Sequence, residues 1–164
     1  MIFLTIGAQE PFDRLVKMVD ELAPQLSLPV VAQVSRTGYQ VKNMQAFEFL
    51  SPAEFESYFQ KATLLISHAG MGTIISALVN AKPMVVMPRL GKFGETRNDH
   101  QVATAERFGK MGYVQVANTE EELKANVMGI INANSSPANH QIGNFASIGL
   151  ISSLQEYILP HNMR

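Results

Sequence analysis

The sequence contains no cysteine, and this absence excludes several kinds of chemistry at once. Without a thiol the chain forms no disulfide, no thiolate nucleophile and no cysteine-ligated metal site, while the compartment is only loosely constrained. Other metal ligands are also scarce, because there are only three aspartates, no Asp-x-Asp pair, and four histidines far apart in the sequence. We therefore expect no metal site and no bound cofactor, and we expect the protein in the cytoplasm.

The chain also lacks a basic excess and a long apolar run. Its 13 Lys and Arg stand against 14 Asp and Glu, a net charge of -1. Proteins that bind nucleic acid usually carry a visible excess of positive charge, so we expect no nucleic-acid partner. No apolar run approaches the roughly 20 residues of a membrane span, and the opening MIFLTIG lacks the basic segment of a signal peptide. We expect contact with a membrane only through a partner.

What is present is the pattern of one α/β domain over residues 1–164. Hydrophobic residues make up 46% and charged residues 16% of the chain, which is typical of a folded protein with its own core. Short apolar runs predict strands at 2–6, 30–34, 46–50, 64–67, 84–87 and 113–116. Helical periodicity predicts helices at 11–22, 52–61, 73–80, 98–110, from 119 onward and at 145–159, with a loop at 133–144. The alternation predicts a Rossmann-like parallel sheet with helices on both faces.

One helix start is especially clear. Ser51 can act as N-cap, Pro52 suits the first helical position, and Glu54 follows the cap by three residues. In the helix that begins there, we expect the aromatic residues to belong to the core rather than to a binding site; they are Phe55, Tyr58 and Phe59.

The turn SHAGMGT separates the strand at 64–67 from the helix that follows it. Backbone N–H groups at a helix N-terminus and the helix dipole favour an anion, so residues 70–73 form a candidate anion site. The turn matches neither the dinucleotide fingerprint nor a Walker A loop. We expect His68, beside the turn, to contact a ligand rather than to act as a catalytic base. Gly7 follows another strand, and either faces the same cleft or simply forms a tight turn.

The loop after the strand at 84–87 adds polar side chains to the same edge of the sheet: Arg89, Lys92, Glu95, Arg97, Asn98, Asp99 and Gln101. Its cations could meet the charge of a diphosphate. Its carboxylates and amides suit a ligand rich in hydroxyl groups. For Asn98 and Asp99 the alternative is a role in capping the next helix.

Three ordered motifs, SHAGMGT, KPMVVMPR and GETRNDHQ, resemble the C-terminal, donor-binding half of family 28 type glycosyltransferases. That group includes the undecaprenyl-muramoyl-pentapeptide N-acetylglucosaminyltransferase. The sequence is most similar to the small single-domain members, the catalytic subunits of the dolichol-linked chitobiose synthase type and their bacterial exopolysaccharide counterparts. The resemblance covers nearly the whole chain and implies one half of a GT-B fold.

The resemblance also implies roles for individual residues. The turn from Gly70 to Thr73 would cradle the diphosphate of a nucleotide sugar, and Gln101 with Asp99 or His100 would hold the hexose hydroxyls. Relatives often carry a ribose-binding glutamate where this chain has Ser76, and Glu95 is the candidate to replace it. The full set expected at the donor site is Gly7, His68, Gly70, Met71, Gly72, Thr73, Arg89, Glu95, Asn98, Asp99, His100 and Gln101.

The function implied by the resemblance is the transfer of a hexose from a nucleotide diphosphate, with UDP favoured, to a lipid-linked saccharide in exopolysaccharide or glycan synthesis. The reaction would be metal-independent and inverting. A GT-B enzyme has two Rossmann-like halves and this chain supplies one, so we expect a membrane-anchored partner subunit that brings the acceptor and the general base. The protein would then lie at the inner face of the membrane.

Two competing classes remain. The chain could be a non-catalytic binding or regulatory module for nucleotide sugars. It could instead be a free-standing enzyme of another Rossmann-like class, such as a nucleotide-sugar epimerase, but that would need a dinucleotide fingerprint and a Tyr-x-x-x-Lys pair, and the sequence has neither. Association of the domain with itself, through the surface that would face a partner, is compatible with all of these.

Overall fold

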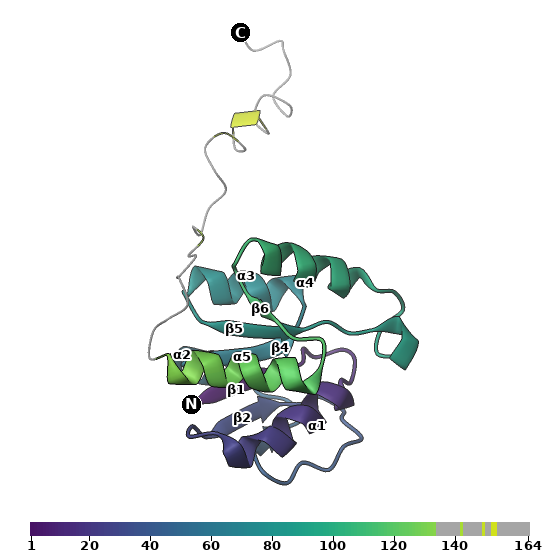
Figure 1. Ribbon diagram of the computed structural model, residues 1–164, viewed down its shortest axis with the longest axis vertical. Coiled ribbons are helices and arrows are strands. Elements are labelled where there is room, and N and C mark those ends of the chain that lie inside the picture. The colour runs from purple at the N-terminus through teal and green to yellow at the C-terminus, as the bar shows by residue number, and fades with distance from the viewer. Residues whose placement is uncertain (134–141, 143–148, 150–151, 154–164) are drawn as a thin grey trace.

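The centre of the computed structural model, which describes residues 1–133, 142, 149 and 152–153, is a parallel sheet of six strands (Figure 1). The strands are β1 (Ile2–Thr5), β2 (Val30–Gln33), β3 (Gln45–Phe47), β4 (Leu64–His68), β5 (Met84–Met87) and β6 (Gln115–Val116). Their order across the sheet is β3-β2-β1-β4-β5-β6, and every pair is parallel. This is the strand order of a Rossmann-like fold, so the predicted fold class is confirmed.

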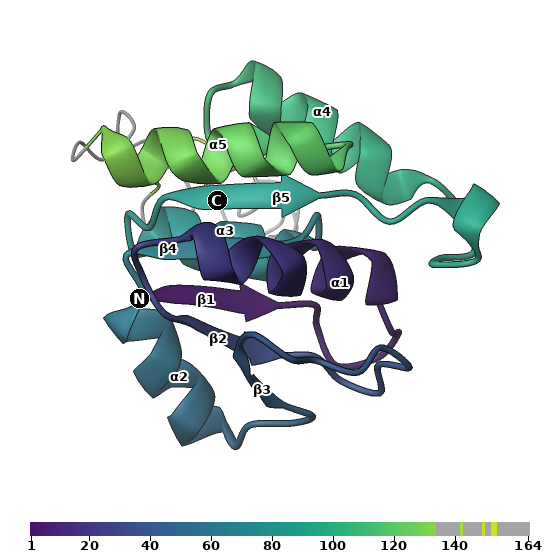
Figure 2. The ribbon, with the colours of Figure 1, turned by 60° about the horizontal axis from the view of Figure 1, so that its bottom comes forward.

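Helices cover both faces of the sheet. They are α1 (Asp13–Leu22), α2 (Pro52–Lys61), α3 (Met71–Val79), α4 (His100–Lys110) and α5 (Glu120–Asn132), with two 3-10 turns, η1 (Ala23–Gln25) and η2 (Gly91–Phe93). Figure 2 shows α1 and α5 in front of the strands and α3 behind them. Because both faces are covered, the central strands β1 and β5 are buried at every position, and apolar residues follow one another in them rather than alternating with polar ones.

The core has two layers, since successive side chains of a strand point to opposite faces. Leu4 and Ile66 belong to the layer under α1 and α5. Phe3 and Leu65 belong to the layer under α2, α3 and α4. The aromatic residues of α2 pack in this second layer as expected, with the rings of Phe3 and Phe55 centred 5.3 Å apart.

The expected start of α2 is also confirmed. The backbone N–H of Glu54 donates to the Ser51 hydroxyl at 3.3 Å, and the Ser51 N–H donates to the Glu54 carboxylate at 2.9 Å. This reciprocal pair satisfies two donors that the helix itself cannot.

Several predicted boundaries shift in the structure. Helix α3 begins at Met71, two residues earlier than expected, because Gly70 has the extended backbone of an N-cap. Strand β3 ends at Phe47 rather than at residue 50, since beyond it the Leu50 N–H bonds to the Gln33 side chain instead of a strand backbone. Helix α4 begins at 100 rather than 98, and β6 spans only two residues. The loop expected at 133–144 and the helix expected at 145–159 fall largely outside the described residues.

The topology decides where a ligand can bind. From β1 the chain builds the sheet outward through β2 and β3, and from β4 it builds in the other direction through β5 and β6. Between β1 and β4, at this change of direction, the loops that leave their carboxyl ends diverge and open a crevice. The loops after β1, β4 and β5 meet at this point, and the last of them extends beyond the sheet at the right of Figure 2.

Candidate functional site

An open cleft of about 780 Å³ lies at the carboxyl ends of β1, β4 and β5. This volume falls in the range of sites for ligands such as nucleotides. The residues that line it come from all three loops: Gly7, Ala8, Gln9, Glu10, His68, Gly70, Arg89, Glu95, Thr96, Arg97, Asn98, His100 and Gln101.

The imidazole of His68 fills the narrow space between two glycines. A Cβ atom added to Gly70 would lie 2.2 Å from Nε2 of His68, and one added to Gly7 would lie 3.1 Å from Cε1. Gly7 also has a φ of +78°, a conformation that favours glycine. Gly7 thus lines the cleft, in a backbone conformation that favours glycine.

His68 is neutral at pH 7. Burial, and to a smaller extent the positive charge of Arg89, lower the pKa of its imidazole to about 4. Its Nδ1 lies 3.2 Å from the Ser67 hydroxyl. A neutral imidazole can exchange hydrogen bonds with a ligand, but a pKa this low makes a weak general base near neutral pH.

The N-terminus of α3 opens beside this histidine. Gly70 is the N-cap, and no side chain caps the helix. The first N–H groups of an α-helix have no partner within the helix, so those of residues 71–73 are available to an anion. Gly72 is exposed, and a Cβ atom there would meet nothing within 4 Å. The backbone at this end of α3 is thus open to a close approach.

Arg89 and Gln101 are buried at the base of the cleft and hydrogen bond its loops together. Arg89 is only 6% exposed, and its Nη2 donates to the carbonyl of Ile6 at 2.8 Å and to that of Glu10. Its backbone N–H donates to Oε1 of Gln101 at 3.2 Å. This bond fixes the Gln101 amide with its oxygen engaged, which leaves the NH2 group as the donor for a ligand. Arg89 holds the loop after β1 against β5, and its contact with a phosphate stays a prediction.

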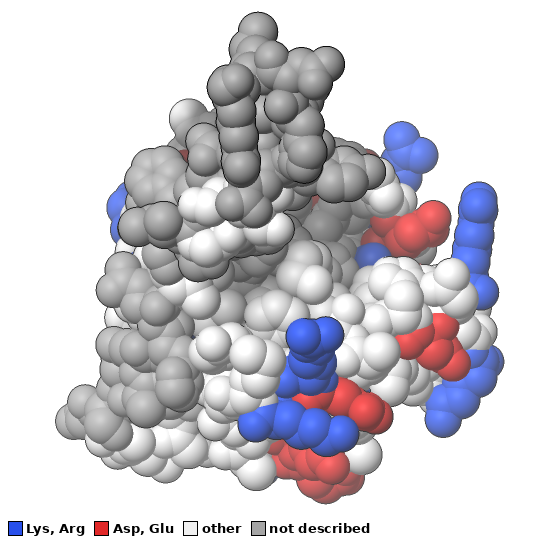
Figure 3. Space-filling model, turned by 90° about the horizontal axis from the view of Figure 1, so that it is seen from above, with Lys and Arg blue, Asp and Glu red and all other residues white. Residues whose placement is uncertain are grey.

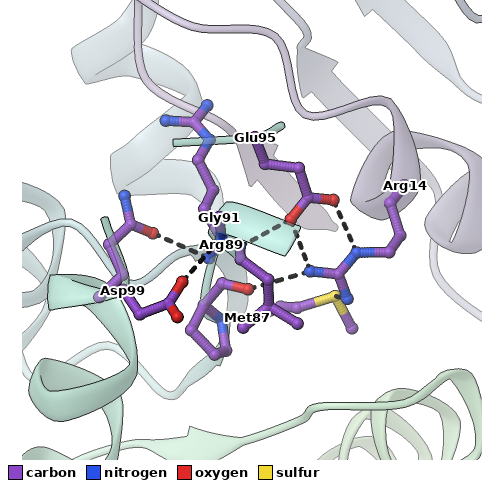
Figure 4. A network of polar contacts seen from close by, with 9 residues as sticks. Arg14, Met87, Arg89, Gly91, Glu95 and Asp99 are labelled. Carbon is purple, nitrogen blue, oxygen red and sulfur yellow. Dashed lines mark hydrogen bonds and ion pairs between the residues drawn. The ribbon is translucent and has the colours of Figure 1, made fainter. Parts of the chain in front are cut away.

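The loop at 88–99 is tied to α1 through Glu95 (Figure 4). Both carboxylate oxygens of Glu95 accept hydrogen bonds from the guanidinium of Arg14, at 2.7 and 2.9 Å. One of them also accepts from the Leu90 N–H at 2.9 Å. Glu95 lines the cleft, yet its oxygens are occupied within the protein, so a ribose contact stays a prediction.

Asp99 does not line the cleft. It occupies the N-cap position of α4 without capping it, and its carboxylate instead accepts a hydrogen bond from the Gly91 N–H at 2.7 Å. Asn98 and His100 do line the cleft, and Oδ1 of Asn98 is hydrogen bonded to Nδ1 of His100. Oδ1 of Asn98 also accepts from the backbone N–H of His100, the first residue of α4, at 3.4 Å. The capping alternative therefore describes Asn98 but not Asp99.

Most of the expected residues thus meet in one cleft, while four expected residues are not part of its lining: Met71, Gly72, Thr73 and Asp99. Sequence reasoning did not find the cleft residues Ala8, Glu10 and Thr96, although their place directly after a strand or in the polar loop was a usable signal. It also gave no role to Arg14, because nothing in the local pattern indicates a partner 81 residues away.

Figure 3 looks down on the side of the molecule that carries α3 and α4. In the described part of this surface, Lys and Arg lie beside Asp and Glu and do not form a continuous basic patch. Met71 and Ile75, one turn apart on α3, are 47% and 42% exposed.

Among the described residues there is no group of three or more potential metal ligands. None of the helices described is long and apolar enough to cross a membrane.

Solved structures share this fold. MurG of Acinetobacter baumannii superposes with a TM-score of 0.67 at 17% identity, over 95% of this chain and 49% of that chain. The solution structure of ALG13 matches with a TM-score of 0.55 at 22% identity, over 93% of both chains. A putative UDP-N-acetylglucosamine 2-epimerase of Listeria monocytogenes reaches 0.64 at 14% identity, over 95% of this chain and 45% of that chain. The chain has the fold of one half of a GT-B protein.

Sequence relatives cover shorter stretches. A UDP-N-acetylglucosamine transferase subunit ALG13 of Cryptococcus neoformans is 37% identical over 70 residues, which is 42% of this chain and 33% of that protein. A UDP-sugar-dependent glycosyltransferase 52 of Dictyostelium discoideum is 30% identical over 84 residues, or 49% of this chain and 4% of that protein. The chain thus spans a third or less of the length of these curated relatives.

The family profile covers far more of the chain. The glycosyltransferase family 28 C-terminal domain matches residues 1–149, a stretch that includes the three loops of the cleft and all the strands described above. This protein therefore belongs to the glycosyltransferase family 28 C-terminal domain family.

Proposed function

We propose that this protein is the donor-binding subunit of a glycosyltransferase, which holds a UDP-sugar in the cleft while a second subunit supplies the lipid-linked acceptor. One observation carries the proposal: an uncapped helix N-terminus opens beside a cleft whose other wall presents amide and imidazole groups. The first feature suits a diphosphate and the second a hexose. Membership of the family and the names of the curated relatives support the same donor.

In this proposal the diphosphate binds at the N-terminus of α3. The backbone N–H groups of Met71, Gly72 and Thr73 donate to its oxygens, and Gly70 and Gly72 let it approach closely. The helix dipole stabilises the negative charge that grows on the departing nucleoside diphosphate, and no metal is needed for this. His68, neutral between its two glycines, contributes a hydrogen bond rather than a charge.

The sugar faces the polar loop. The NH2 group of Gln101 donates to a hexose hydroxyl, because its oxygen is already engaged by Arg89. Asn98 and His100, which line the same wall, add further hydrogen bonds. Orientation of the donor in this way fixes the anomeric carbon for attack, which is the main contribution that one half of such an enzyme can make.

In the transfer itself, the acceptor hydroxyl oxygen forms a bond to the anomeric carbon as the bond from that carbon to the diphosphate breaks. Attack from the opposite side inverts the configuration. The hydroxyl proton passes to a general base that we assign to the partner subunit, since His68, with its lowered pKa, is a weak base near neutral pH. The partner anchors the complex at the inner face of the membrane, in exopolysaccharide or glycan synthesis.

Calorimetry of UDP and UDP-GlcNAc tests the donor site directly. Gly72→Leu places a side chain in open space, so the protein should fold normally and lose binding of both ligands. Gln101→Ala should weaken UDP-GlcNAc about tenfold, the effect of one lost hydrogen bond to a ligand. Gln115→Ala, on the exposed end of β6, is the matched glutamine control and should bind like the wild type.

Binding that survives both Gly72→Leu and Gln101→Ala would contradict this site. Transfer is tested by co-expression with the product of a neighbouring gene and measurement of radiolabelled sugar in membrane lipid. Sugar should reach lipid only when both proteins are present. Binding without transfer in any combination would instead favour a non-catalytic binding module, and conversion of UDP-GlcNAc to an epimer by this chain would contradict the proposal.

A further inference from the structure

The segment Thr96 to Asn98 forms part of the cleft wall, and its position depends on the residues on either side of it. On one side the Glu95 carboxylate accepts from the Leu90 N–H at 2.9 Å. On the other the Asp99 carboxylate accepts from the Gly91 N–H at 2.7 Å. Both bonds lie within the loop at 88–99. They fold the loop on itself but do not attach it to the rest of the domain.

The attachment near Glu95 comes from α1. The guanidinium of Arg14 binds Glu95 in the two-pronged geometry of the strongest ion pairs, with Nε to Oε1 at 2.7 Å and Nη2 to Oε2 at 2.9 Å (Figure 4). Nη2 also donates to the Pro88 carbonyl at 3.0 Å, and Nη1 lies 3.2 Å from the sulfur of Met87. The Arg14 side chain thus contacts the start of the loop and also binds Glu95 within it.

The surroundings of this ion pair strengthen it. The side chains of Arg14 and Glu95 are only 18% and 9% exposed, so water screens their attraction much less than at the surface. The guanidinium carbon lies 5.2 Å from the ring centres of both Phe12 and Phe93. A flat guanidinium can stack on aromatic rings and still bond in its own plane, which a lysine ammonium cannot do.

We infer that Arg14 is a positioning residue for the donor sugar: through Glu95 it sets the place of the wall segment 96–98 without touching the ligand. Arg14 is absent from the residues that line the cleft, whereas Glu95 and all three residues of the segment are present. The role of that wall in sugar recognition rests on the function proposed above. Loss of Arg14 frees the loop but leaves the helix N-terminus that binds the diphosphate unchanged.

Two variants and a control test this inference by calorimetry. Arg14→Met should weaken binding of UDP-GlcNAc roughly tenfold and binding of UDP less than about threefold, because only the sugar faces the loop. Arg14→Lys keeps the charge without the two-pronged geometry and should recover part of the loss. Lys17→Met removes a cation from the same helix, whose partner Glu21 is 3.9 Å away in an exposed pair, and should change neither affinity.

A measurement without ligand tests the same role independently. The loop contains two exposed trypsin sites, Lys92 and Arg97. Arg14→Met should raise the rate of cleavage there roughly tenfold over wild type, because proteolysis follows the population of the opened loop. Cleavage in Lys17→Met should match wild type.

The outcomes separate the two proposals. Unchanged cleavage of the loop in Arg14→Met overturns the positioning role whatever the ligand does. An equal loss of UDP and UDP-GlcNAc binding also overturns it, since that result describes general damage to the fold. A third outcome is faster cleavage of the loop in Arg14→Met while the wild type binds neither UDP nor UDP-GlcNAc. That result would support the role of Arg14 in holding the loop and would contradict the proposed function instead.

Discussion

Replacing Gly70 with alanine should destabilise the protein by steric overlap alone. The backbone of Gly70, with φ of −85° and ψ of 129°, is one that alanine adopts without strain. The added Cβ, however, would lie 2.2 Å from Nε2, 2.8 Å from Cε1 and 2.9 Å from Cδ2 of His68. On its other side the ring faces Gly7, where an added Cβ would lie 3.1 Å from Cε1, so a ring that moves away from Gly70 moves toward this backbone.

The size of the loss follows from these contacts. Overpacking of this kind costs about 1 to 3 kcal/mol, and displacement of the ring would also strain the bond between His68 and Ser67, worth about 1 kcal/mol. We expect a total loss of about 2 to 4 kcal/mol, which in a domain of this size lowers Tm by roughly 5 to 15 °C. Urea unfolding followed by far-UV circular dichroism measures the free energy of unfolding.

Two further variants isolate the cause. The double variant Gly70→Ala with His68→Ala removes the clashing ring, so it should be about as stable as His68→Ala alone. Gly72→Ala, two residues along the same backbone, adds a Cβ that meets nothing within 4 Å. It should keep the stability of the wild type or gain up to about 1 kcal/mol, since alanine favours a helix over glycine. A stable Gly70→Ala protein, or strictly additive losses in the double variant, would refute this reasoning.

Two other predictions concern buried ionisable groups. The pKa of His68 is lowered to about 4 in the folded protein, so its contribution to the free energy of unfolding is complete above the ordinary histidine pKa and is lost as the pH falls below it. Between about pH 7.5 and 5 this should lower the free energy of unfolding, measured with urea, by about 2 kcal/mol. His68→Gln should lack this part of the pH dependence. Asp20 is fully buried and accepts from Tyr39, Lys42 and Asn43; Asp20→Ala should cost about 2 to 3 kcal/mol, and a loss below about 0.5 kcal/mol would refute that role.

Much of the fold follows from local pattern, which the sequence carries directly. The apolar runs of β4 and β5 lie within a residue of their predicted places, and the serine, proline and glutamate at the start of α2 form the expected cap. Each of these features depends on residues within a few positions of one another. Sheet type follows from their alternation, and the position of the cleft follows from sheet type.

Features that depend on side-chain partners far apart in the sequence could not be predicted in this way. A glutamate in a polar loop looks the same whether it faces a ligand or a buried arginine, and Glu95 faces Arg14. Similarly, two glycines after different strands give no sign that one histidine ring lies between them. The carboxylate of Asp99 shows the same limit, because its bond to Gly91 folds a loop that has no regular period. Three-dimensional contact decides each of these roles.

The two outermost strands have a consequence for solubility. β3 and β6 contain three and two residues, so they offer few unpaired backbone groups to which another chain could add a strand. Next to them lie VVAQ and MVVM, uncharged and rich in β-branched residues, the kind of segment that aggregates when exposed. The short outer strands pair with the outer edges of β2 and β5, so these edges are not exposed to another chain. Substitutions that detach β6, such as loss of Val116, should therefore promote fibrillar aggregation before they abolish the rest of the fold.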